Sequence, residues 1–111
     1  MKKGIKILAI LVFLLTLLVE ANNKNEAELQ IKLGIKAAFN NQWAESLYRW
    51  TKAIDLEPNN FAAHNNLAVA YEQFGYFDNA LEEYEIAYKL APDNLSIKSN
   101  IASFKETYKV K

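Results

Sequence analysis

The chain has 111 residues, of which 51% are hydrophobic, 13 are Lys or Arg, 13 are Asp or Glu and none is cysteine. This length corresponds to one small domain, and the lack of cysteine excludes disulfides, thiolate metal sites, thiol nucleophiles and a lipoprotein-type lipid anchor. Without residues 1–21, 10 basic and 12 acidic residues remain, for a net charge of −2. Because these charges are scattered and form no basic patch, we do not expect nucleic acid as a partner.

Residues 1–21 have the form of a secretory signal peptide. A short start with three lysines precedes thirteen residues, 7–19, that are apolar except for Thr16. The small side chain of Ala21 favours a cut between Ala21 and Asn22. We predict that the leader is removed at this point.

The alternative is an uncleaved signal anchor, with residues 5–19 in the membrane. A helix needs about 17 to 25 apolar residues to cross the hydrocarbon layer, and this run is shorter, so cleavage is favoured. Glu20, beside the proposed cut, is the observation against cleavage. In both cases the basic start stays on the cytoplasmic side, which leaves residues 22–111 outside the cytoplasm, in the periplasm or secreted.

The rest of the chain contains two copies of a 34-residue unit, residues 27–60 and 61–94. Six positions are identical between the copies, and five more carry related side chains. The identical pairs are Leu33/Leu67, Leu47/Leu81, Ala53/Ala87, Leu56/Leu90, Pro58/Pro92 and Asn60/Asn94, and the related pairs are Gly34/Ala68, Ile35/Val69, Trp43/Phe77, Ser46/Ala80 and Trp50/Tyr84.

The sizes of the paired residues predict closely packed helical hairpins. Small residues at Gly34/Ala68, Ser46/Ala80 and Ala53/Ala87 let two antiparallel helices approach, and large residues such as Trp50 fill the space beside them. Gly75 suits the left-handed residue that ends a helix, and Asn41 replaces it in the first unit as the next most tolerant type.

Proline and asparagine mark the other helix boundaries. Pro58 and Pro92 each end a second helix, and the Asn59-Asn60 or Asp93-Asn94 that follows caps the next one. We predict five helices, at about residues 25–40, 43–57, 60–74, 77–91 and 94–109.

The second unit resembles the tetratricopeptide repeat (TPR), whose pattern it follows at Leu67-Ala68, Tyr71, Gly75-Tyr76-Phe77, Ala80, Tyr84, Ala87 and Pro92. The first unit is a weaker copy, with Leu33-Gly34, Trp43, Ser46, Trp50, Ala53 and Pro58, but with Ala37 in place of Tyr71. The resemblance implies an all-α fold of antiparallel helical hairpins stacked as a short right-handed α-solenoid.

Residues 95–110 begin a third unit and are expected to form a capping helix. Repeats bury their faces only against neighbours, so the second hairpin needs a cover. Ile97, Ile101, Phe104 and Tyr108 are spaced to form one apolar stripe for this purpose. The predicted domain therefore spans residues 22–111.

In this family the first helix of each repeat lines a concave groove, so the resemblance points to a protein-binding site on those helices. An extended peptide or a partner helix would lie in the groove, with apolar contacts at one end and polar contacts at the other. The residues expected there are Ile31, Ile35, Ala38, Phe39, Asn65, Val69, Glu72, Gln73, Ser99 and Ser103. The alternative is that Ile31 and Phe39 merely cover the first helix.

Some cytoplasmic members hold the carboxylate of a chaperone tail with a set of Lys, Asn and Arg side chains. In this chain Asn66 matches that set, whereas Ile31, Ile35, Ser96 and Asn100 stand at the other positions. A chaperone-tail adaptor is therefore disfavoured.

The sequence carries no pattern that predicts catalysis, a cofactor or a metal. His64 occupies a position where the family prefers a large aromatic, and without Cys or a carboxylate pair at ligand spacing we assign it a structural role. Ser46 belongs to the close helix contact, and the serines at 96, 99 and 103 have no histidine close in sequence to act as base.

Three surface features have simpler structural explanations. Glu82, Glu83 and Glu85 fit a solvated helix face and follow no calcium loop. Asn94-Leu95-Ser96 matches the glycosylation pattern but is also the expected helix cap. Tyr48, with Arg49, is expected to face outward as a minor contact patch.

The function predicted from these features is an exported adaptor, not an enzyme, that holds a segment of one envelope protein in its groove. The alternative is a structural component that self-associates or attaches to the membrane by its leader.

Overall fold

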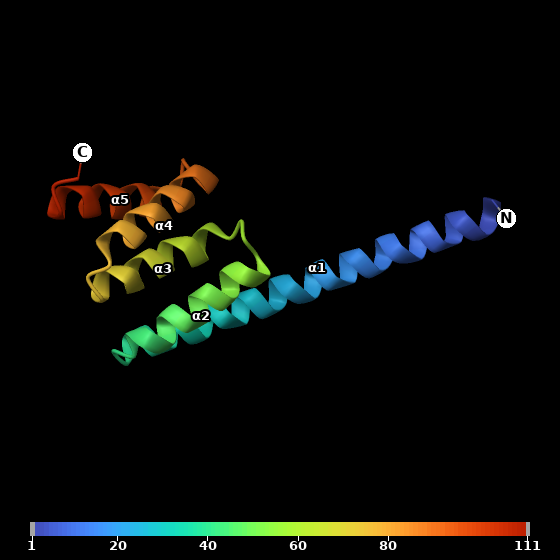
Figure 1. The fold of residues 1–111 in the computed structure, drawn as a ribbon, viewed down its shortest axis with the longest axis horizontal. Coiled ribbons are helices and arrows are strands. Elements are labelled where there is room, and N and C mark those ends of the chain that lie inside the picture. The colour runs from blue at the N-terminus through green and yellow to red at the C-terminus, as the bar shows by residue number, and fades with distance from the viewer. Residues whose placement is uncertain (1, 111) are drawn as a thin grey trace.

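The computed structural model describes residues 2–110 and folds them into five α-helices (Figure 1). They are α1 (Lys2–Phe39), α2 (Trp43–Leu56), α3 (Phe61–Gln73), α4 (Phe77–Leu90) and α5 (Leu95–Thr107), and residues 2–110 contain no strand. Each helix packs on the next one in the chain, from α1 on α2 to α4 on α5. This arrangement confirms the prediction of an all-α stack of helical hairpins.

Helix α1 is much longer than predicted. It begins at Lys2 instead of near residue 25 and continues unbroken through the leader. No Gly or Pro interrupts the sequence between Gly4 and Gly34, so nothing in that stretch ends the helix. The predicted start was wrong because the leader was set aside as a separate segment.

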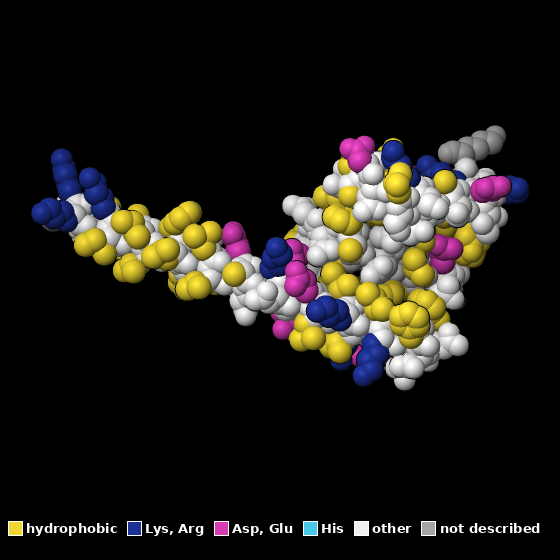
Figure 2. Space-filling model, turned by 180° about the vertical axis from the view of Figure 1, so that it is seen from behind, with side chains coloured by type: hydrophobic (Ala, Val, Ile, Leu, Met, Phe, Trp, Pro, Cys, Tyr) yellow, Lys and Arg dark blue, Asp and Glu magenta, His cyan; other side chains and the backbone are white. Residues whose placement is uncertain are grey.

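The first half of α1 projects from the stacked helices as an apolar arm. Residues 2–22 are exposed, and the first buried residue of the helix is Ala27. Hydrophobic side chains cover the arm between a basic tip and the folded part (Figure 2). By length and composition, α1 is long and apolar enough to cross a membrane.

The two hairpin turns have the predicted conformations. Asn41 and Gly75 both adopt left-handed backbone, with φ of 57° and 75°. Asn60 and Asn94 cap α3 and α5, because their side-chain oxygens accept hydrogen bonds from the backbone nitrogens three residues later, at 3.0 and 3.1 Å. The remaining four helices consequently lie within two residues of their predicted limits.

The core depends on close approach of paired helices. Ser46 of α2 and Ala80 of α4, which are equivalent in the repeat, are fully buried. Gly34 of α1 is buried against the ring of Trp50, which is 3% exposed and donates a hydrogen bond from Nε1 to the carbonyl of Ile31 at 3.2 Å. The predicted alternation of small and large residues is confirmed.

Helix α5 covers the second hairpin as expected. Ile97 and Phe104 are each 2% exposed, and Ile101 is half-buried. The Phe104 ring packs on those of Tyr84 and Tyr108, with centroid separations of 5.4 and 4.8 Å. Only Tyr108, at 36% exposure, lies at the edge of this stripe.

Candidate protein-binding groove

Two adjoining hollows lie along the first helices of the hairpins. The first has a volume of about 260 Å³, and its walls come from α1, α2 and α3. It is lined by Ile35, Ala38, Phe39, Trp43, Trp50, Asn66 and Val69.

The second hollow has a volume of about 310 Å³ and extends from α1 across α3 to the start of α5. It shares Ile35 and Asn66 with the first hollow, so the two form one groove. Its lining residues are Ile31, Ile35, Phe61, Ala62, Asn65, Asn66, Asn94, Ser96 and Ile97.

The apolar end of the groove carries exposed hydrophobic side chains. Phe39 is 87% exposed and Ile35 is 40% exposed, although both are large hydrophobic residues. In Figure 2 hydrophobic side chains gather on the folded part as well as on the arm. Phe39 and Ile35 thus form an exposed apolar edge beside the first hollow.

Six of the ten predicted groove residues come together in these hollows. They are Ile31, Ile35, Ala38, Phe39, Asn65 and Val69. Gln73, Ser99 and Ser103 are exposed but line neither hollow.

Glu72, also predicted in the groove, lines neither hollow. Its carboxylate accepts a hydrogen bond from the hydroxyl of Tyr84, so it joins α3 to α4. Burial raises the pKa of Tyr84, and the hydrogen bond to Glu72 raises it further, so the phenol stays a donor at all ordinary pH values. Glu72 is therefore part of the hairpin contact.

Asn65 lies in the groove but already has a polar partner. Its Oδ1 accepts a hydrogen bond from Nδ2 of Asn100 at 3.1 Å, which links α3 to α5. Asn100 is one of the residues that depart from the chaperone-tail set. This link fixes the orientation of the Asn65 amide at the polar end of the groove.

Sequence reasoning missed the contribution of Trp43 and Trp50 to the groove. Trp50 was expected to fill the space beside the paired helices, and it is indeed 3% exposed, yet both tryptophans also form part of the wall of the first hollow. The available signal was their position: aromatic residues at the hairpin interface next to the apolar Ile35 and Phe39.

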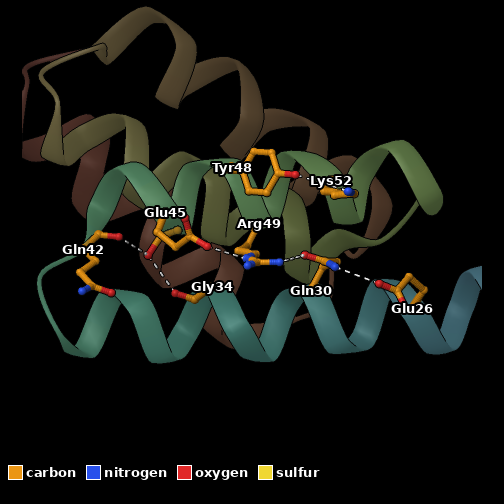
Figure 3. Close-up of polar contacts among 9 residues, drawn as sticks. Glu26, Gln30, Gly34, Gln42, Glu45, Tyr48, Arg49 and Lys52 are labelled. Carbon is orange, nitrogen blue, oxygen red and sulfur yellow. Dashed lines mark hydrogen bonds and ion pairs between the residues drawn. The ribbon is translucent and has the colours of Figure 1, made fainter.

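The hairpins also share a polar position that has different partners in the two units. In the first unit, Gln30 accepts a hydrogen bond from Arg49 at 3.2 Å and donates one to Glu26 at 2.9 Å (Figure 3). Arg49 also pairs with Glu45 at 2.7 Å. Arg49 therefore lies against α1, so its prediction as an outward contact residue was wrong, whereas Tyr48 is 51% exposed as predicted.

In the second unit, the equivalent residues are His64 and Glu83. His64 is 5% exposed, with Nδ1 at 2.5 Å from Glu83 and Nε2 at 2.7 Å from the carbonyl oxygen of Pro58. The structural role predicted for His64 agrees with this burial. The prediction that Glu83 belongs to a solvated face was wrong, because its side chain reaches back to α3.

Both ring nitrogens of His64 face acceptors, so the imidazolium form, with two N–H donors, fits the site. Burial lowers the pKa of His64, but the hydrogen bond to Glu83, the one to the Pro58 carbonyl and the charge of Glu83 together raise it above its ordinary value of 6.5. The ring is a pH-sensitive link between α3 and α4.

We therefore expect the free energy of unfolding to fall as the pH rises past neutrality. The folded pKa is raised, so this contribution is complete below the unfolded pKa of about 6.5 and is lost as the pH passes the folded pKa. His64→Gln, which copies Gln30 of the first unit, should flatten the profile. Urea denaturation at several pH values between about 6 and 9 tests this; parallel profiles for the two proteins would contradict it.

Within residues 2–110, no three His, Cys, Asp or Glu side chains gather in a group that would hold a metal ion. The chemistry available in the groove is that of apolar contact and amide hydrogen bonding.

Comparison with known proteins places the repeat in context. Residues 40–75 match a family model described as TPR repeat, and residues 61–94 match one described as Tetratricopeptide repeat. A stretch of 49 residues is 43% identical to Protein O-mannosyl-transferase TMTC4 of Mus musculus, and covers 44% of this chain and 7% of that protein. An uncharacterized protein of Haemophilus influenzae is 28% identical over 83 residues, which are 75% of this chain and 46% of that protein.

The chain thus spans less than half of the length of each of these relatives. Among solved structures, the OM64 TPR domain of Arabidopsis matches with a TM-score of 0.72 at 22% identity, covering 78% of this chain and 71% of that one. At this level of identity the likeness shows the fold.

Proposed function

We propose that the chain is an exported adaptor that holds a peptide or helix of one envelope protein in the groove formed by α1, α2, α3 and α5. The match of residues 40–94 to tetratricopeptide-repeat models supports a protein-binding role. The observation that carries the proposal is Phe39, 87% exposed beside an apolar hollow. The groove is short, so it accommodates one segment of one partner. The side chains of Ile35 and Phe39 would contact an apolar residue of that segment, and Asn66 would offer its amide to the backbone.

The groove variant Phe39→Ala is expected to lower the recovery of the partner by roughly tenfold or more, because exposed aromatic anchors dominate binding energy. The measurement is affinity capture of the full chain from the cell envelope, followed by quantitative mass spectrometry. Leu95→Ala is the matched control, since Leu95 is 79% exposed and lines neither hollow. Equal recovery with Phe39→Ala, Asn66→Ala and the wild type would end the groove proposal.

Export is proposed from the basic start and apolar run of the arm, which makes no contribution to the core. We expect the same capture experiment to find a chain that begins at Asn22 in the soluble envelope fraction. The alternative is a retained anchor, and the unbroken course of α1 through Ala21 favours it. Intact chains confined to the membrane fraction would replace cleavage by anchoring and would leave the groove proposal untouched.

A further inference from the structure

A further hollow, separate from both hollows of the groove, lies on the outer side of α5. It lies between α4 and α5 and has a volume of about 680 Å³. Apolar residues form part of the hollow, and the charged residues around them are mainly lysines. The lining residues are Tyr88, Ile101 and Ala102, with Lys89, Lys98, Lys105 and Glu85.

The backbone after α5 repeats the hairpin turns of the two units. Lys109 stands 34 residues after Gly75 and has φ of 55°, close to the values of Asn41 and Gly75. The backbone nitrogen of Val110 donates to the carbonyl of Lys105 at 2.9 Å, and a bond of the same length closes the turn after α3. The end of α5 therefore has the same backbone form as the ends of α1 and α3, which are the first helices of the two hairpins.

Ala102 occupies the position at which a first helix receives its partner. It lies 34 residues after Ala68, which is fully buried in one cluster with Tyr84, and 68 residues after Gly34, which contacts Trp50. Ala102 is exposed instead. In both complete units the equivalent small residue contacts a large side chain of the second helix, whereas Ala102 faces solvent.

Lys98 adds a charge requirement to this surface. In the 34-residue register Lys98 is equivalent to Gln30 and His64. Gln30 pairs with Arg49, the residue before Trp50, and His64 pairs with Glu83, the residue before Tyr84. A helix that packed on α5 as α2 packs on α1 would place the residue before its bulky side chain against Lys98. The other lysines of the hollow also favour negative charge.

We propose that α4 and α5 form a second binding site, which takes one acidic amphipathic helix of a partner protein. The helix packs antiparallel to α5, with a bulky side chain on Ala102 and an acidic residue, immediately before it, against Lys98. The site is independent of the groove and of its occupant.

A suitable probe is a synthetic peptide of residues 77–90, held helical by a staple on its outward side. It carries Glu83 and Tyr84 in the required order, and four acidic residues with one lysine. Fluorescence anisotropy with the full chain in detergent micelles should show saturable binding. Ala102→Glu is expected to abolish it, and Lys98→Glu to weaken it roughly tenfold.

A charge swap makes the test specific. Binding of the Glu83→Lys peptide to the Lys98→Glu protein should return to within roughly threefold of the original affinity, because the pair is restored with opposite signs. Lys36→Glu, at an exposed lysine of α1, is the control and should leave binding unchanged. Circular dichroism checks that each variant keeps its helix content.

Three results would overturn the proposal. The first is no saturable binding of the stapled peptide to the wild type, and the second is a charge swap that fails to restore affinity. The third is cross-linking of the wild type into dimers that Ala102→Glu abolishes, which would make a second copy of this chain the occupant.

Discussion

Replacing Gly34 by alanine is expected to lower the free energy of unfolding by a net of up to about 2 kcal/mol. A Cβ atom at this position would lie 2.3 Å from Nε1 of Trp50 and 2.6 Å from its Cδ1. The ring cannot easily withdraw, because it is 3% exposed and its Nε1 is bonded to the carbonyl of Ile31. Overpacking costs about 1 to 3 kcal/mol, and the better helix propensity of alanine offsets up to about 1 kcal/mol of it.

Urea denaturation of the full chain in a mild detergent, followed by far-UV circular dichroism, measures this loss. Gly4→Ala is the control, since a Cβ there meets nothing within 4 Å. The double variant Gly34→Ala with Trp50→Tyr reproduces the Ala68 and Tyr84 pair of the second unit and should recover part of the stability. If Gly34→Ala alone is as stable as the wild type, the ring of Trp50 is not held as tightly as its contacts indicate.

The predictable parts of the fold are the turns and helix caps, whose residues recur at equivalent positions of the two units. Asn41 and Gly75 stand at the same point of the 34-residue register, and both adopt the left-handed conformation that ends a first helix. Asn60 and Asn94 repeat in the same way as helix caps. A turn or a cap depends on a few neighbouring residues, so its sequence signal is nearly complete.

The groove was only partly predictable because its members depend on rotamers and on distant partners. Glu72 lies on the expected helix, but its carboxylate turns to Tyr84, twelve residues away. Glu83 is likewise drawn from solvent to His64. The register did hold a clue here, since Gln30 and Arg49 occupy the same two positions in the first unit, and comparing these pairs would have indicated a contact.

The start of α1 was missed for a different reason. Apolar residues of the leader and polar residues of the first repeat both form helix, and no breaker separates them. The change from apolar to polar composition near residue 21 therefore separates the exposed arm from the packed part of α1, and the secondary structure stays helical across it. The arm and the first repeat share one helix of 38 residues.

Truncating Phe104 to alanine should produce the largest loss of stability, about 3 to 5 kcal/mol. The side chain is 2% exposed and is enclosed by Ala68, Ala80 and the ring of Tyr84. For a small array whose total stability is only about 5 to 15 kcal/mol, this loss is a large fraction.

The control is Phe39→Ala, which makes the same chemical change at a residue that is 87% exposed and should alter stability by less than about 0.5 kcal/mol. In repeat arrays each unit is stabilised mainly by its neighbours, so the damage from Phe104→Ala should concentrate at one end. Native-state hydrogen exchange would show faster exchange in α4 and α5 than in α1 and α2. Equal acceleration in all five helices would contradict local coupling and would mean that the whole array unfolds as one unit.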